Sequence, residues 1–237
     1  MQGFFSQVSI TIFTMPNTSK TKPVLVIVGA IIAAGIVALY LSRQGNAADS
    51  TGTAGPVSAG AAADGGGRIR GAADAPVTLT EYGDYQCPTC GLYHPIVSEL
   101  LSRYQGKLKL EFRHFPLITA HPNAMKAAIA AESAAEQGKF WEMNDLLFEH
   151  QNEWSRSPAA ETIFLQYALQ IGLDSNRFMQ AMKSPATQER VLADVRRGND
   201  IVKGTPTFVI NGTVIQDLPN LEGLSNLVAG QLKAMGR

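Results

Sequence analysis

The hydrophobic and polar positions in the C-terminal part of the chain follow two periods, which separate strands from helices. Residues 77–82 (VTLTEY) and 107–113 (KLKLEFR) alternate with a period of two, as half-buried strands do. The residues between them, 88–104, have a helical pattern in which Pro95 predicts a kink and Gly106 ends the helix. This order of strand, helix and strand predicts parallel strands joined by a right-handed crossover.

The middle of this part, about 120–202, has no convincing strand pattern and is predicted to be helical. We expect helices over 124–137, over a segment after Gly138 with an apolar stripe at Phe140, Met143 and Leu147, and over 158–171, 174–183 and 186–201. The expected N-caps of the last three helices are Ser157, Asp174 and Ser184.

Strand patterns return near the C-terminus. Residues 207–210 and 213–215 flank Asn211-Gly212, which is a strong signal for a two-residue hairpin. A last helix is expected over 221–235. The whole order of elements predicts one α/β domain that carries a helical insertion.

The N-terminal part differs in composition and predicts three further segments. Residues 24–41 (VLVIVGAIIAAGIVALYL) carry no charge and suit a transmembrane anchor, with a cleaved signal sequence as the alternative. Lysines before the span favour a cytoplasmic tail at 1–23. Residues 42–67 are mostly Gly, Ala, Ser and Thr and are expected to be a flexible linker. The folded domain would then occupy 68–237.

The charge balance restricts the classes of function. The chain has 20 basic and 20 acidic side chains, so its formal net charge is zero. A nucleic-acid partner is not expected, because phosphate contacts need a basic surplus. No GKS or GKT phosphate loop is present.

Both cysteines, Cys87 and Cys90, lie within EYGDYQCPTCGLYHP at 81–95. Three interpretations compete. A metal site needs about four ligands, and neither a second cysteine pair nor a metal-binding histidine spacing is present. A structural disulfide would close a loop too short to restrain much of the unfolded chain. The third interpretation is a pair that reacts.

The reactive interpretation explains more of the local sequence. Cys87 falls between a strand and a helix, where the helix dipole and free amides favour a thiolate. Pro88 suits the first helical position. Cys90 follows about one turn later and can resolve a mixed disulfide formed at Cys87.

This stretch resembles the DsbA-like thiol:disulfide oxidoreductases of the thioredoxin fold. The matching motifs are APVTLTEYGDYQCPTC at 75–90, GKFWEMNDLLFEHQ at 138–151 and GTPTFVING at 204–212, and the similarity covers about 70–237. The resemblance implies a thioredoxin-like fold with a helical insertion.

The resemblance also implies roles for individual residues. Cys87 would be the exposed attacking sulfur and Cys90 the buried resolving one. Pro206 would be a cis-proline facing the disulfide, and Thr205 would offer its backbone to a bound peptide; an ordinary strand-edge proline is the alternative. Glu81 would be a buried acid that relays a proton for Cys90, with a solvated strand residue as the alternative.

Two positions depart from the best-known relatives. The pair between the cysteines is Pro88-Thr89, where strongly oxidising relatives often carry histidine second. Thr89 either tunes the redox properties or is a simple residue of the first helical turn. Gln86 stands where thioredoxins usually have tryptophan. These departures favour an oxidase over a cytosolic-type reductase but leave the strength of the oxidant open.

We therefore expect a membrane-tethered enzyme, on the outer side of the cytoplasmic membrane, that forms disulfides in exported proteins. A quinone-linked reoxidase of the DsbB or VKOR kind is the expected partner, with no cofactor or metal beyond the Cys87–Cys90 disulfide. A monomer is expected, since the linker offers no dimerisation domain. The alternatives are a reductase or isomerase of the same fold, and a binding module or chaperone with an incidental cysteine pair.

Overall fold

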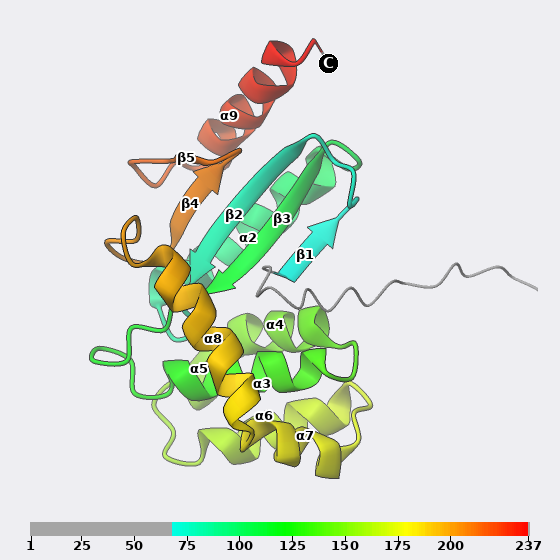
Figure 1. The fold of residues 1–237 in the computed structure, drawn as a ribbon, viewed down its shortest axis with the longest axis vertical. Helices are drawn as coiled ribbons and strands as arrows, with labels where there is room; N and C mark the ends of the chain where they lie inside the picture. The colour runs from blue at the N-terminus through cyan, green and yellow to red at the C-terminus, as the bar shows by residue number, and fades with distance from the viewer. Residues whose placement is uncertain (1–67, 237) are drawn as a thin grey trace, which may run out of the picture. The chain divides into compact units, whose positions relative to one another are not determined.

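The computed structural model describes residues 68–236, which form a mixed β-sheet flanked by helices and a separate block of helices (Figure 1). The strands are β1 (Arg68–Gly71), β2 (Val77–Gly83), β3 (Leu108–His114), β4 (Thr207–Ile210) and β5 (Thr213–Val214). The helices are α2 (Pro88–Arg103), α3 (Ala124–Ala135), α4 (Phe140–Glu149), α5 (Gln151–Trp154), α6 (Ala160–Gln170), α7 (Ser175–Met182), α8 (Pro185–Gly198) and α9 (Leu221–Ala234).

The sheet has the strand order β1-β3-β2-β4-β5. Strands β2 and β3 are parallel and are connected through α2, which confirms the predicted β-α-β unit. Strand β4 pairs antiparallel with β2, and β5 pairs antiparallel with β4 across Asn211-Gly212. Both turn residues have positive φ, 46° and 84°, as a tight hairpin of primed type requires.

Strand β1 was not predicted. Its four residues, RIRG, contain one apolar side chain, so they show no alternation that a pattern could detect. The strand exists because it adds antiparallel to the edge of β3, with Arg68 opposite Phe112. Arg68 and Arg70 also bind acidic side chains of the helical block.

One face of the sheet is covered by α2 and α9. Val77 and Leu79 of β2 pack there against Val97 and Leu100 of α2 and the apolar side of α9. Because side chains alternate along a strand, Glu81 belongs to the same face as Val77 and Leu79. An acidic side chain therefore lies on the apolar side of the sheet.

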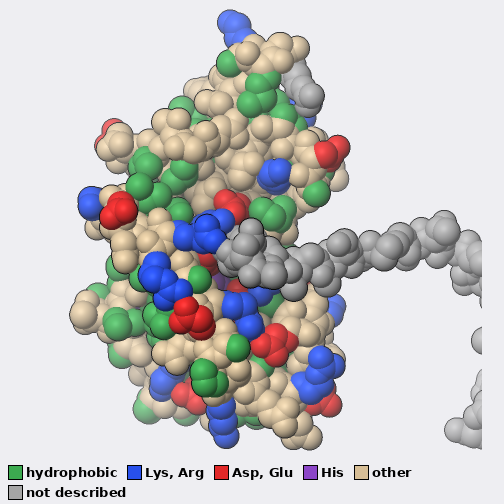
Figure 2. Space-filling model, viewed as in Figure 1, with side chains coloured by type: hydrophobic (Ala, Val, Ile, Leu, Met, Phe, Trp, Pro, Cys, Tyr) green, Lys and Arg blue, Asp and Glu red, His purple; other side chains and the backbone are tan. Residues whose placement is uncertain are grey.

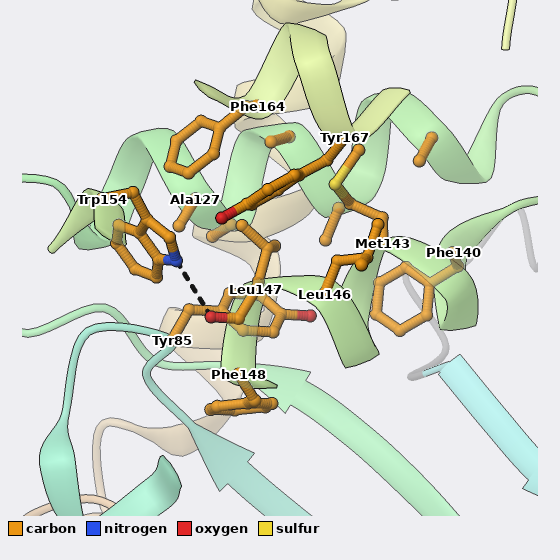
Figure 3. Packing of buried hydrophobic residues seen from close by; sticks show 14 of the residues in the cluster. Tyr85, Ala127, Phe140, Met143, Leu146, Leu147, Phe148, Trp154, Phe164 and Tyr167 are labelled. Carbon is orange, nitrogen blue, oxygen red and sulfur yellow. Dashed lines mark hydrogen bonds between the residues drawn. The ribbon is translucent and has the colours of Figure 1, made fainter. Parts of the chain in front are cut away.

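The helical block, α3 to α8, has its own apolar core, and α8 leads from it back toward β4 (Figure 1). Figure 3 shows Trp154, Phe164 and Tyr167 packed together, with the Trp154 indole donating to the Leu147 carbonyl over 2.9 Å. The block begins and ends within the predicted insertion, about 120–202. Tyr85, two residues before the first cysteine, is part of this core.

The expected helix starts were partly correct. Asp174 is the N-cap of α7, and its carboxylate accepts the Arg177 amide at 2.8 Å. Ser184 is the N-cap of α8 but makes no capping side-chain bond. Ser157 is not an N-cap, because α6 begins at Ala160 and Ser157 accepts the Ala159 amide in the preceding turn.

The predicted tail 1–23, anchor 24–41 and linker 42–67 lie outside the described residues and stay predictions. Within 68–236, no helix combines the length and the apolar character that a membrane span requires. Figure 2 shows acidic and basic side chains lying side by side over the helical block, in keeping with the balanced charge of the chain.

Candidate active site

The cysteine pair lies at the start of α2, directly after the loop that connects β2 to this helix. Cys87 is the N-cap of α2, with the extended backbone angles of that position, and Pro88 is the first helical residue. Proline suits this place because its missing N–H would have no intrahelical partner. The predicted position of the pair at a helix N-terminus is therefore confirmed, and both cysteines are free thiols in this structure.

The Cys87 sulfur is less exposed than the resemblance implied. Only 7% of the residue is exposed, since Cys87 is part of the buried hydrophobic cluster of the helical block, and its thiol donates a hydrogen bond to the Thr205 carbonyl over 3.3 Å. A hydrogen bond from Cys90 outweighs partial burial and lowers the pKa of Cys87 to about 5. The backbone amides of Thr89 and Cys90 add to this effect, as expected at a helix N-terminus.

Cys90 has the opposite character. It is fully buried, at 0% exposure, one turn inside α2. Burial raises the pKa of Cys90 well above its ordinary value, and the hydrogen bond to Cys87 raises it further. The Asp84 amide donates to the Cys90 sulfur over 3.5 Å. One sulfur is thus a stabilised thiolate at neutral pH while its neighbour keeps its proton.

Thr205 and Pro206 lie in the connection between α8 and β4, and the peptide bond between them is cis. The Thr205 carbonyl faces Cys87, as its hydrogen bond to the thiol shows. Among the described residues, the buried Thr205 hydroxyl has no hydrogen-bond partner. The Thr205 side chain is nevertheless one of the groups that lower the pKa of Cys87.

Glu81 is buried, with 3% exposure, so the alternative of a solvated strand residue is wrong. Its Oε1 atom has no hydrogen-bond partner among the described residues. Burial, followed by the nearby Cys87 charge, raises the pKa of Glu81 to about 8. The acid also contributes to the raised pKa of Cys90, which indicates that the two groups are electrostatically coupled.

Pro88 and Thr89 form the first turn of α2. Pro88 is exposed and Thr89 is half-buried. The backbone amide of Thr89 supports the Cys87 thiolate. Any effect of the Thr89 side chain on redox properties therefore stays a prediction.

Sequence reasoning missed Asp84, which organises the loop before the cysteines. Its fully buried carboxylate accepts the Gln86 amide at 2.7 Å and the Leu117 amide at 2.9 Å, and lies 2.7 Å from Nδ1 of His121. Its carbonyl accepts the Cys87 amide at 3.1 Å. An acidic residue directly after a buried strand was the available signal.

Gln86, noted above only as a departure from thioredoxins, is also part of this loop. Its side-chain oxygen accepts the Asn123 amide at 2.7 Å, and its nitrogen donates to the Ser155 carbonyl over 2.8 Å. The glutamine therefore joins the cysteine loop to the helical block at two points. No local pattern could indicate this, because both partners lie far away in sequence.

A mixed sheet with a β-α-β unit, a helical insertion, a cis-proline connection and a cysteine pair of unequal acidity defines the class of thioredoxin-fold thiol–disulfide oxidoreductases. The chain belongs to the thioredoxin family, whose model matches residues 63–229.

Two solved structures illustrate the match of the fold. Alpha-DsbA1 of Wolbachia pipientis is 21% identical, with a TM-score of 0.63 over 71% of this chain and 92% of that one. A thioredoxin-like oxidoreductase of Silicibacter pomeroyi is 25% identical, with a TM-score of 0.61 over 70% of this chain and 92% of that one. The resemblance to DsbA-like proteins is confirmed at the level of the fold.

The curated relatives carry a different name. "Na(+)/H(+) antiporter NhaA 3" of Salinispora tropica is 44% identical over 161 residues, which are 68% of this chain and 24% of that protein. The chain thus spans about a quarter of the length of this relative. The match concerns a part of each relative, and the name describes proteins much longer than that part.

Proposed function

We propose that this chain is a thiol:disulfide oxidase that introduces disulfides into other proteins through Cys87 and Cys90. The observation that supports this most is the unequal acidity of the two thiols, with the pKa of Cys87 lowered to about 5. A stabilised thiolate favours the reduced form of the pair. The disulfide form then accepts electrons readily, which is the property of an oxidase.

The reaction proceeds through two exchanges. A substrate thiolate attacks Cys87 of the disulfide, forming a mixed disulfide and breaking the bond to Cys90, which leaves with the electron pair and takes up a proton. A second substrate thiolate then attacks the substrate sulfur and releases Cys87. The substrate loses two electrons and two protons, and the protein pair gains the electrons. The low pKa of Cys87 makes it the better leaving group in the second exchange.

In this proposal, Glu81 serves the first exchange. With a pKa of about 8 it carries a proton at neutral pH, and burial raises the pKa of Cys90 well above its ordinary value. Proton transfer from the acid to the departing Cys90 sulfur is therefore favourable. The same acid can take the proton back when Cys90 attacks a mixed disulfide.

Thr205 and Pro206 would bind the substrate backbone beside Cys87, and Pro88 with Thr89 would tune the pair. We further propose that the substrates are exported proteins, that a quinone-linked membrane oxidase regenerates the disulfide, and that residues 24–41 anchor a monomer with its catalytic domain outside the cytoplasm. The support for these points is the apolar 24–41 segment and the oxidising compartments in which such pairs work.

The test uses the oxidised protein and a reduced, unfolded substrate with known native disulfides. We expect stoichiometric loss of substrate thiols as the Cys87–Cys90 disulfide is reduced. Mixed instead with a substrate that carries a disulfide, Cys90→Ala should accumulate mixed disulfides, because its Cys87 thiolate attacks that disulfide, releases one substrate thiolate and is not resolved. These complexes are visible as reducible high-mass bands, and Cys87→Ala should not form them. A reduction potential below that of the glutathione couple would instead support a reductase. Equal trapping by both variants, or by neither, would falsify the assignment of Cys87 as the reacting sulfur.

A further inference from the structure

The cysteine loop is held by a side chain from the helical block. Gln151, the first residue of α5, donates through its Nε2 atom to the Tyr85 carbonyl over 2.6 Å and to the Cys87 carbonyl over 3.0 Å. The two carbonyls flank Gln86, so one amide group spans the segment that leads into α2. This contact joins residues 64 positions apart.

Gly91 leaves the space for this amide. A Cβ atom at Gly91 would lie 3.1 Å from Oε1 of Gln151, closer than an ordinary van der Waals contact. The Gly91 amide also donates to the Cys87 carbonyl over 3.2 Å, as the first intrahelical bond of α2. The Cys87 carbonyl therefore accepts one bond from its own helix and one from the helical block.

This carbonyl determines how the first turn of α2 begins. Because the Cys87 carbonyl accepts two hydrogen bonds, rotation of the peptide plane between Cys87 and Pro88 is restricted. This rotation sets the position of the Cys87 sulfur relative to the first turn of α2. The sulfur must lie near the amides of Thr89 and Cys90 and near the Cys90 thiol, which are the groups that stabilise its thiolate. A donor on this carbonyl thus acts on the thiolate without touching the sulfur.

We propose that Gln151 is a positioning residue for Cys87, admitted by Gly91, and that it keeps the reacting sulfur in the place where the first turn of α2 stabilises it. The proposal rests on the proposed function for its importance in exchange. The structural part of the proposal does not depend on that function. It concerns how the helical block, a feature absent from a bare β-α-β unit, controls the acidity of a thiol in the other half of the domain.

The first experiment compares the full-length wild type with Gln151→Ala. We expect the Cys87 pKa, measured by thiolate absorbance or by alkylation rate against pH, to rise by about one pH unit, which lowers the thiolate fraction at pH 5 about fivefold. The reduction potential should fall by about 30 mV, the equivalent of a tenfold change in a two-electron equilibrium. Gln170→Ala, at an exposed position of α6, is the matched control and should change neither quantity.

A second variant separates positioning from a general loss of stability. Gly91→Ala should raise the Cys87 pKa in the wild type, because the new methyl group displaces the Gln151 amide. In a Gln151→Ala background it should have no further effect on that pKa, although alanine favours the helix. This non-additivity is not expected if Gln151 only contributes to folding.

Two results would overturn the proposal. One is a Cys87 pKa and potential in Gln151→Ala equal to those of the wild type, even if the melting temperature falls. If Gln151→Ala does not fold, an unchanged Cys87 pKa in Gly91→Ala is equally decisive. Because thiol acidity is measured without substrate, a wild type that fails to oxidise proteins would refute the proposed function and leave this comparison intact.

Discussion

The pKa values of two buried glutamates of this domain are shifted in opposite directions, and the difference lies in the groups that each carboxylate contacts. Glu81 and Glu132 are each 3% exposed. Burial raises the pKa of Glu81 to about 8, and its Oε1 atom has no partner among the described residues. Burial also acts on Glu132, but hydrogen bonds from His114 and Arg68 hold its pKa far below the ordinary range. The first arrangement suits proton transfer, and the second suits a fixed negative charge.

The first prediction concerns Glu81→Gln. The pKa of Glu81 is higher in the folded state than the unfolded value of 4.5, so the unfolded state binds fewer protons between these values. Stability should therefore decrease as pH rises from about 4.5 to about 8. Since each tenfold change in proton affinity is about 1.4 kcal/mol, Glu81→Gln should gain a few kcal/mol over the wild type at pH 8.5 and little at pH 4. Denaturant unfolding against pH measures this difference.

Glu81→Gln should also carry out thiol–disulfide exchange more slowly than the wild type. Without a titratable acid beside it, Cys90 should leave and attack more slowly, with the largest effect where proton transfer limits the rate. Rapid-mixing measurements of exchange between pH 5 and 8 provide the check. If the rates match those of the wild type at every pH, Glu81 has no part in the proton transfer.

A second prediction at this scale concerns Thr89→His. An imidazole at this position adds a donor and a partial positive charge near the thiolate, so the pKa of Cys87 should fall below its present value of about 5. The disulfide should become more oxidising, by about 30 mV for a tenfold change in the equilibrium with glutathione. Thr89→Asn, which adds no positive charge, is the control. A potential that stays constant or becomes more reducing would show that Thr89 is a simple first-turn residue.

At the scale of elements, the helical block is joined to the sheet by a buried ion cluster around Glu132 of α3. Its carboxylate lies 2.9 Å from Nε of Arg68 in β1, 2.9 Å from Nε of Arg190 in α8 and 3.1 Å from Nε2 of His114 in β3. Two strands and two helices therefore meet at one side chain. This cluster connects β1, which has a weak strand pattern, to the helical block.

The prediction at this scale is that Glu132→Gln destabilises the domain strongly at neutral pH. The glutamine keeps the shape but leaves Arg68 without the carboxylate that it binds, and breaking a buried pair costs about 3–5 kcal/mol. Because the pKa of Glu132 is lower in the folded state, its contribution is present above pH 4.5 and is lost as pH falls further. The gap between variant and wild type, measured by urea unfolding, should therefore narrow in acid.

Glu189→Gln is the matched control for this experiment. Glu189 pairs with Arg196 on the surface of α8, where the two side chains are 60% and 57% exposed. An exposed pair of this kind contributes about 1 kcal/mol or less. If Glu132→Gln and Glu189→Gln lower the free energy of unfolding by the same small amount, the buried cluster does not hold the helical block to the sheet.

At the scale of the whole molecule, the chain combines a thioredoxin-family domain with an N-terminal part that the described residues do not include. The apolar 24–41 segment and the linker-like 42–67 segment predict a tethered domain. Full-length protein expressed with its own N-terminus should stay in the membrane pellet after a carbonate wash. External protease should release the domain beginning near residue 68. Recovery of a soluble form that begins near Ala48 would instead identify a cleaved signal sequence.

Features that depend on neighbouring residues could be predicted from the amino-acid pattern. The β-α-β unit and the C-terminal hairpin follow from hydrophobic period and from the turn chemistry of Asn211-Gly212. The place of Cys87 and Cys90 at the start of a helix follows from Pro88 and the helical pattern after it. Each of these signals lies within a few consecutive residues, so it can be recognised without knowledge of the tertiary structure.

The contacts between groups that are distant in sequence became visible in the folded domain. Strand β1 pairs with β3 and contacts Glu132 of α3. Cys87 donates a hydrogen bond to the Thr205 carbonyl, and Gln151 of α5 donates two hydrogen bonds to the cysteine loop. Each of these contacts joins residues from separate elements. Periodicity records which face of an element is buried but not which side chain lies opposite, so these contacts could not be predicted from the sequence.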